Sequence, residues 1–251
     1  MIGPIVIGGF SGSGTRMVAK IVKNSGVYME PDSGGKMDSQ WVCNNIDSSC
    51  DGIINSNSFD QSNRIEKYKK YKTIILGKIK KEGLSHLAYG WKAPRDIYHI
   101  KALYETFKNL LFIHLIRDGR DMALSKNTGF LRVYGKCFFN DSLANDIPIK
   151  KAFLWNHSNV FVRDYIDSCK IDMSKKYLIV RYEDVCQNPE SEIARIQNFI
   201  GLYQKVDPSI VEPSEGIGRW SRLDDTKKEL KMAIQNEVKE GLEVYNYETN
   251  L

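Results

Sequence analysis

A glycine-rich turn near the N-terminus limits the folds open to this chain more than any other feature. An apolar run from Ile5 to Gly9 leads directly into Phe10-Ser11-Gly12-Ser13-Gly14-Thr15-Arg16. Gly9, Gly12 and Gly14 allow the backbone to bend sharply and to approach a ligand closely. The exposed N–H groups at the start of the following helix would attract an anion. The pattern therefore predicts a buried strand, a phosphate-binding turn and a helix.

The spacing of this turn is similar to a nucleotide-binding loop that normally ends in Lys followed by Ser or Thr. Gly9 and Gly14 are in register with that loop, but Thr15 stands at the lysine position and Arg16 at the position of the metal-binding hydroxyl. This difference disfavours a magnesium-dependent ATPase or kinase, although an unusual kinase stays an alternative. A turn that needs glycine only for close packing is a second alternative.

The other apolar runs predict an α/β fold. Strands are expected at residues 88–92, 110–116 and 177–180, and helices at residues 15–25, 97–108, 120–126, 149–168, 189–200 and 225–240. This alternation predicts a central, mostly parallel sheet flanked by helices, with a P-loop-like nucleotide site. No linker divides the chain, so a single domain covering residues 1–251 is expected. Ligands of such sheets bind beyond the carboxyl ends of the strands.

Bulk properties favour a soluble protein of the cytoplasm. No stretch approaches the roughly 20 apolar residues that cross a membrane, and no signal peptide is evident. The net charge of +5 is compatible with an anionic ligand, whereas no nucleic-acid-binding motif accompanies it. The five cysteines lack metal-site spacing and suggest neither a disulfide framework nor a zinc site, so reduced thiols are expected; the cysteines are Cys43, Cys50, Cys137, Cys169 and Cys186.

A second anion site is predicted after the strand at residues 110–116. Arg117 follows that strand, and Ser125 lies two turns along the next helix. A guanidinium and a hydroxyl could together hold a second phosphate. The neighbouring Arg120 and Asp121 are typical of a solvated first helical turn.

Several segments together resemble the PAPS-dependent sulfotransferases, which use 3′-phosphoadenosine-5′-phosphosulfate (PAPS) as donor. The turn Gly12-Ser13-Gly14-Thr15 is similar to the family's 5′-phosphosulfate loop, and Arg117 and Ser125 have the spacing of its 3′-phosphate residues. The further matches are Trp91-Lys92-Ala93-Pro94-Arg95, Val180-Arg181-Tyr182-Glu183-Asp184-Val185 with Asn188-Pro189 and Phe199-Ile200-Gly201, and Gly216-Ile217-Gly218-Arg219-Trp220. The matches occur in the family's order and cover most of the chain.

The resemblance implies where PAPS would bind. The residues expected at the cofactor are Gly12, Ser13, Gly14, Thr15, Arg16, Arg117, Ser125, Tyr182, Arg219 and Trp220. Arg219 would add a donor to the 3′-phosphate, and the aromatic faces of Tyr182 and Trp220 would contact adenine, with core packing as the alternative for both. No metal is required in this scheme, because basic groups neutralise the phosphates.

The sequence differs from the family at the catalytic loop. The family has Lys or Arg where this chain has Gly12, so we expect Arg16 and Lys92 to stabilise the departing phosphate instead. A strand-end Lys92 that only reaches water is the alternative. For the general base, Asp38 is the first candidate and Glu30 the second, with Asp32 also in this loop; each is equally compatible with a solvated loop carboxylate. His99 and His114 carry less weight as bases, and His114, which alternates with apolar neighbours in an expected buried strand, is more typical of a core histidine.

The resemblance implies transfer of a sulfuryl group from PAPS to a hydroxyl or amine, with release of 3′-phosphoadenosine-5′-phosphate (PAP). The acceptor would be a small molecule or a carbohydrate, bound between the loops at residues 29–61 and 131–147. A PAP- or PAPS-binding protein that has lost activity stays an alternative, for which Gly12 is the main observation. Neither a nucleic-acid partner, a membrane nor an oligomeric state is predicted.

Overall fold

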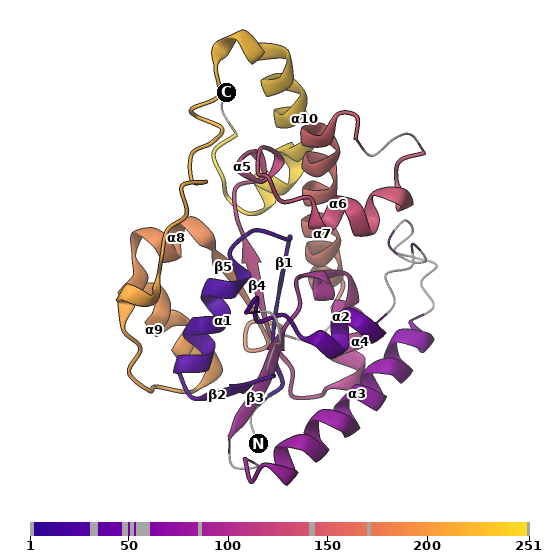
Figure 1. Ribbon diagram of the computed structural model, residues 1–251, viewed down its shortest axis with the longest axis vertical. Helices are drawn as coiled ribbons and strands as arrows, with labels where there is room; N and C mark the ends of the chain where they lie inside the picture. The colour runs from indigo at the N-terminus through magenta and orange to yellow at the C-terminus, as the bar shows by residue number, and fades with distance from the viewer. Residues whose placement is uncertain are drawn as a thin grey trace.

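The protein has an α/β fold built on five parallel strands (Figure 1). The structure, a computed structural model, describes residues 3–30, 35–46, 50, 53, 61–84, 87–140, 144–169 and 172–249. In spatial order the strands are β2 (Val27–Met29), β3 (Ala88–Lys92), β1 (Ile5–Gly9), β4 (Leu111–Ile116) and β5 (Tyr177–Arg181). The predicted fold class is confirmed, and the sheet is parallel throughout.

Helices cover both faces of the sheet, as Figure 1 shows. One face packs against α1 (Thr15–Asn24), α8 (Tyr182–Gln187) and α9 (Pro189–Ile200). The other packs against α2 (Gln40–Asn45), α3 (Ser62–Lys81), α4 (Ile100–Thr106), α5 (Gly119–Ala123), α6 (Gly129–Tyr134), α7 (Ile147–Ser168) and α10 (Lys228–Val244). Strand β1 is buried on both sides because Ile5 and Ile7 point into one core and Val6 into the other. This explains why its sequence is uniformly apolar.

The predicted strands are confirmed, while one strand, one long helix and the short helices α2, α6 and α8 were not predicted. The missing strand is β2, which has only three residues, and the missing long helix is α3. Four short 3-10 helices complete the described elements: η1 (Pro94–His99), η2 (Gly135–Cys137), η3 (Pro208–Ile210) and η4 (Asp225–Lys227). Residues 94–99 belong to η1, so the helix expected at residues 97–108 is divided between η1 and α4.

The strand register brings the predicted anion-binding segments to the same edge of the sheet. Gly9 lies opposite Leu115 of β4, and Ile7 lies opposite Lys92 of β3. Because the strands are parallel, the loops that follow β1, β3 and β4 all leave from the carboxyl edge. The chain after β2 continues along β3, where the Ser39 N–H donates to the Lys92 carbonyl at 2.7 Å. This contact brings the 36–39 segment to the same edge.

A disulfide joins Cys50 to Cys137, so the expectation of reduced thiols throughout is wrong for this pair. Their Cα atoms are 5.1 Å apart although 87 residues separate them in sequence. Spacing in sequence could not reveal this proximity, which results from the packing of η2 beside the loop that contains Cys50. The bond ties together the two loops expected to form the acceptor pocket. A cytoplasmic location stays a prediction, and no helix in the described part of the chain has the length and apolarity needed to cross a membrane.

Candidate active site

The turn between β1 and α1 has the geometry of an anion-binding loop. Gly12 and Gly14 have φ angles of +95° and +102°, a region that favours glycine. Thr15 and Arg16 form the first turn of α1, where N–H groups have no acceptor within the helix. The Ser13 hydroxyl and N–H both donate to the Phe10 carbonyl, at 2.6 and 3.0 Å. Ser13 therefore holds the loop in shape, while the groups around it face outward.

The backbone explains why the chain has glycine where the resemblance implies a basic residue. At a φ of +95° a side chain at residue 12 would be strained, and its Cβ would lie 3.2 Å from the Asn127 side chain. At residue 14 a Cβ would overlap the ring of Tyr182. Close packing therefore contributes to the glycine pattern, in addition to the open N–H groups.

Lys92, Asp38 and Arg16 come together at the carboxyl end of β3. The Lys92 ammonium is only 4% exposed and forms an ion pair with Asp38 Oδ1 at 2.6 Å, so the alternative in which Lys92 merely reaches water is wrong. Burial lowers the pKa of Lys92; Asp38 opposes this shift, and Arg16 adds to it by repulsion. Arg16 lines the same cavity as Lys92 and Asp38. A buried cation, an exposed guanidinium and a carboxylate thus share one wall.

Glu30 occupies a different environment from Asp38. Its Oε2 accepts hydrogen bonds from the hydroxyls of Ser39 and Tyr71, the latter at 2.5 Å. Trp41 stacks on the Tyr71 ring, with centroids 4.6 Å apart. Glu30 is thus held by side chains of the α2 and α3 layer, whereas Asp38 lines the cavity described below. Asp32 lies outside the described residues.

Arg117 is a buried cation at the end of β4 whose hydrogen-bonding capacity is only partly used. Its side chain is 3% exposed, and Nη1 donates to Ser214 Oγ at 3.1 Å. Nε and Nη2 are buried and have no acceptor among the described residues. A Cβ built on Gly216 would overlap Nη2 of Arg219 and would lie 2.8 Å from Nη2 of Arg117, so both guanidinium groups pack against this glycine. Two adjacent cations with unused donors form an anion site.

Lys151 of α7 joins this cluster, and sequence reasoning missed it. The ammonium is 1% exposed and donates to the Ala123 carbonyl and to Ser125 Oγ, both at 3.0 Å, and also to the Ser125 carbonyl. Because an ammonium only donates, the Ser125 oxygen accepts from Lys151 and its own hydrogen can point elsewhere. Burial lowers the pKa of Lys151 to about 8, and the positive charge of Arg219 contributes. Ser125, Lys151, Arg219 and Arg117 thus form the second anion cluster.

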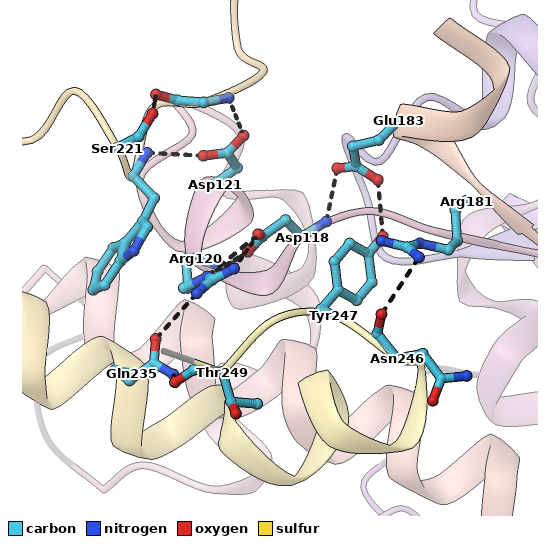
Figure 2. Close-up of polar contacts among 12 residues, drawn as sticks. Asp118, Arg120, Asp121, Arg181, Glu183, Ser221, Gln235, Asn246, Tyr247 and Thr249 are labelled. Atoms are coloured by element: carbon cyan, nitrogen blue, oxygen red, sulfur yellow. Dashed lines mark hydrogen bonds and ion pairs between the residues drawn. The ribbon is translucent and has the colours of Figure 1, made fainter. Parts of the chain in front are cut away.

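A network of buried carboxylates fixes the second anion cluster (Figure 2). Asp121 accepts hydrogen bonds from the N–H groups of Gly218 and Trp220, at 2.6 and 2.8 Å, which holds Arg219 between them. Glu183 accepts from the Asp118 N–H at 3.0 Å and from the Tyr247 hydroxyl at 2.8 Å. The chain after β4 is thereby tied to both the 214–221 loop and the C-terminal segment.

The expectation that Arg120 and Asp121 are solvated is wrong. They are 7% and 3% exposed, because the C-terminal segment packs over the short helix α5. Arg120 donates to both carboxylate oxygens of Asp118, and its guanidinium lies 5.7 Å from the Trp220 ring centroid. Burial raises the pKa of Asp121, and the two N–H donors oppose this shift.

A cavity of about 790 Å³ opens at this edge of the sheet. It is lined by the turn between β1 and α1 at residues 11–16, which we call the phosphate loop, by Asp38, Lys92 and Tyr182, and by residues of α6. Arg117, Ser125 and Arg219 are not among the lining residues that the structure describes. Tyr182 connects the two clusters, because its ring touches Gly14 and also lies 4.4 Å from Arg117 Cζ. Trp220 is not among the described lining residues; its side chain is half-buried and packs against the core.

His114 belongs to the core, as the sequence predicts, and His99 is buried as well. His114 hydrogen-bonds to the Tyr177 hydroxyl and to Asn159 Oδ1, and burial lowers its pKa to about 3. His99 is buried beside Asp96 and the Tyr68 hydroxyl. Within the described residues, no group of three or more His, Cys, Asp or Glu side chains is arranged to hold a metal ion.

Comparison with known proteins gives one family. A model described as the sulfotransferase family matches residues 4–205. The fold is similar to that of the sulfotransferase domain of the olefin synthase from Synechococcus PCC 7002, with 13% identity, a TM-score of 0.58 and coverage of 99% of this chain and 97% of that one. It is also similar to a sulfotransferase from Alicyclobacillus acidocaldarius, with 12% identity, a TM-score of 0.55 and coverage of 99% of this chain and 97% of that one. A sulfotransferase from Mycobacterium avium is similar as well, with 12% identity, a TM-score of 0.60 and coverage of 98% of this chain and 78% of that one. No curated protein sequence matches the chain.

Proposed function

We propose that this chain, which belongs to the PAPS-dependent sulfotransferase family, transfers a sulfuryl group from PAPS to a hydroxyl or amine of a small-molecule or carbohydrate acceptor. One observation carries the proposal. Arg117 is a buried cation with two unused donors, and Tyr182 joins it to the glycine-rich loop on the same edge of the sheet. Two anion sites that share one aromatic ring suit a nucleotide phosphorylated at two separate positions.

The residues present fit this donor at both ends. Arg117, Arg219 and Ser125, supported by Lys151, would hold the 3′-phosphate, because three cations and a hydroxyl gather there. The N–H groups of Gly14, Thr15 and Arg16 would hold the 5′-phosphosulfate at the start of α1. Tyr182 would contact the nucleotide between them, and Trp220 extends the aromatic surface. PAPS supplies the activated sulfuryl group, and in this proposal the protein supplies cations in place of a metal.

Catalysis would depend on the wall formed by Arg16, Lys92 and Asp38. As the bond from sulfur to the bridging oxygen breaks and the bond from the acceptor oxygen or nitrogen to sulfur forms, negative charge passes to the 5′-phosphate of PAP. Arg16 and Lys92 would stabilise that charge. Asp38 would accept the proton that the acceptor loses. Glu30 is less suited to this task, because two hydroxyl groups already donate to its carboxylate.

A ligand titration tests the donor. PAP without magnesium should raise the melting temperature, whereas ATP with magnesium should not. Arg117→Ala should abolish the stabilisation by PAP, because the 3′-phosphate would lose its buried partner. A shift with magnesium and ATP but none with PAP would instead favour a kinase and would refute the proposal.

Turnover separates an enzyme from a binding protein that has lost activity, the second candidate that Gly12 suggests. We expect transfer of labelled sulfate from PAPS to members of an acceptor library. Arg16→Ala and Lys92→Ala should lower this turnover more than they weaken PAP binding. Unchanged turnover in either variant would remove that residue from the catalytic set, and PAP binding without any turnover would favour the degenerate binder.

A further inference from the structure

Among the residues that the structure describes, the cavity wall carries more positive charge than the donor needs. Two of these lining residues are carboxylates, Asp38 and Glu212. The basic side chains that line it are Arg16, Lys20, Lys36, Lys92, Arg95 and Arg132. The 3′-phosphate cluster is separate from this set, because Arg117 and Arg219 lie outside the lining. The cavity therefore needs to match only the phosphosulfate end of the donor, which brings one negative charge on phosphorus and one on sulfur, and the remaining cations exceed that demand.

The surplus cations do not belong to the proposed catalytic pair. Lys92 already faces Asp38 at 2.6 Å, and Arg16 is at the first turn of α1. Lys36, Arg95 and Arg132 come from three other segments: the chain before α2, the 3-10 helix η1 and the helix α6. Their convergence on one cavity does not follow from sequence proximity.

Lys36 and Arg132 are available to a ligand. In the part of the chain that the structure describes, no carboxylate pairs with Lys36 or Arg132, and both side chains are exposed. Arg95 donates through Nη1 to the Cys43 carbonyl at 3.2 Å, which keeps its guanidinium at the wall. An exposed guanidinium such as that of Arg132 can bind a carboxylate, sulfate or phosphate group through two parallel hydrogen bonds.

Arg132 is the best placed of the three for the acceptor side. Helix α6 begins at Gly129, whose position is next to Ser11 of the phosphate loop. Arg132 is one turn further on, and Phe130 and Val133 of the same helix also line the cavity. The wall beside the loop therefore combines apolar surface with a cation, which suits an organic molecule that bears an acidic group.

We propose that the acceptor is itself an anion, carrying a carboxylate, sulfate or phosphate group that Arg132 binds with support from Lys36 and Arg95. This inference rests on the proposed function, because it concerns the second substrate of the same site. It narrows the acceptor from any hydroxyl or amine to one on an acidic sugar, an acidic peptide or a comparable charged molecule.

The test compares matched ligands on the protein saturated with PAP. One set is a neutral disaccharide and its uronate, sulfated and phosphorylated forms, and the other is a tyrosyl peptide with and without flanking aspartates. Calorimetry should show at least about tenfold tighter binding for a charged member than for its neutral counterpart, with a difference that shrinks at high salt. The charged ligand with the largest increase in affinity over its neutral counterpart identifies the acidic group that the acceptor carries.

Matched variants assign the effect to Arg132. Arg132→Gln should remove the preference for charge while leaving PAP affinity unchanged. Lys136→Gln replaces an exposed cation in the neighbouring η2 that is not part of the lining, and should leave the preference intact.

Equal affinity for the charged and neutral members of both sets would overturn the inference. An equal loss of the preference for charged ligands in the Arg132 and Lys136 variants would also overturn it. Its failure can be distinguished from failure of the proposed function. If PAP stabilises the protein but no charge preference is found, only the inference fails; if PAP itself does not bind, the proposed function fails first.

Discussion

Because Lys151 is buried in the second anion cluster with a lowered pKa, we predict that PAP affinity depends on pH between 7 and 9. Its pKa is lowered to about 8 by burial and by the positive charge of Arg219. A doubly charged 3′-phosphate at Ser125 would oppose both effects and return the pKa toward its ordinary value of about 10.4. Binding would therefore raise the pKa and take up a proton wherever free Lys151 is partly neutral. Because protons are taken up on binding, affinity must fall as pH rises.

The size of the effect follows from these two pKa values. At pH 7 free Lys151 is about nine-tenths protonated, and at pH 9 about one-tenth, whereas the complex stays almost fully protonated. The dissociation constant of PAP should therefore rise about tenfold over this range, which corresponds to about 1.4 kcal/mol. At pH 8, binding should take up roughly half a proton.

Isothermal titration calorimetry in buffers of different ionisation enthalpy measures both quantities. Adenosine 5′-monophosphate, which lacks the 3′-phosphate, is the matched ligand, because titration of Lys92 beside the 5′ site would affect both ligands alike. Lys151→Arg keeps a positive charge throughout the range and should remove the difference between the two ligands. PAP affinity that is equal at pH 7 and pH 9, or a pH dependence that persists in the arginine variant, would refute the reasoning. The comparison of PAP with adenosine 5′-monophosphate uses the wild-type protein, so it tests the prediction even if the Lys151→Arg variant does not fold.

Three further predictions concern separate parts of the molecule. Gly14→Ala should destabilise the protein by about 1–3 kcal/mol in urea unfolding, because the φ of +102° is strained and the methyl group overlaps Tyr182; wild-type stability would contradict this. Cys137→Ser should cost about 2–4 kcal/mol, and dithiothreitol should lower the melting temperature of the wild type but not of this variant. Asp38→Asn should lower kcat by roughly a hundredfold or more while PAP affinity stays within about twofold; unchanged kcat would exclude Asp38 as the base.

The elements that the sequence predicted best are those with a strong local pattern. Strand β1 and helix α9 have the predicted bounds, because an uninterrupted apolar run and a helix ending at Gly201 leave little ambiguity. Strand β2 is too short to be recognised alone. Helix α3 was missed because lysines dominate its sequence, although Arg64, Tyr68, Tyr71, Ile75 and Ile79 are buried along one helical face. Attention to that spacing would have found it.

The site was predictable where it follows a strand and unpredictable where distant segments meet. Arg16 and Lys92 were expected to act together, and both line the same cavity. Lys151 gave no sequence signal, because a lysine in a long helix normally faces water. Its burial depends on α7 packing against α5. The bond between Cys50 and Cys137 depends in the same way on tertiary packing.

Residues 206–249 lie beyond the region that the family model matches, yet they complete the second anion cluster. Ser214 and Arg219 belong to this segment, and Tyr247 anchors it to Glu183. A protein shortened at residue 205 would still contain every strand of the sheet and the phosphate loop, but Arg117 would be open to water. Under the proposed function, the smallest fragment able to bind PAP would therefore extend to Tyr247. Boundaries drawn from sequence matching alone would omit Ser214 and Arg219.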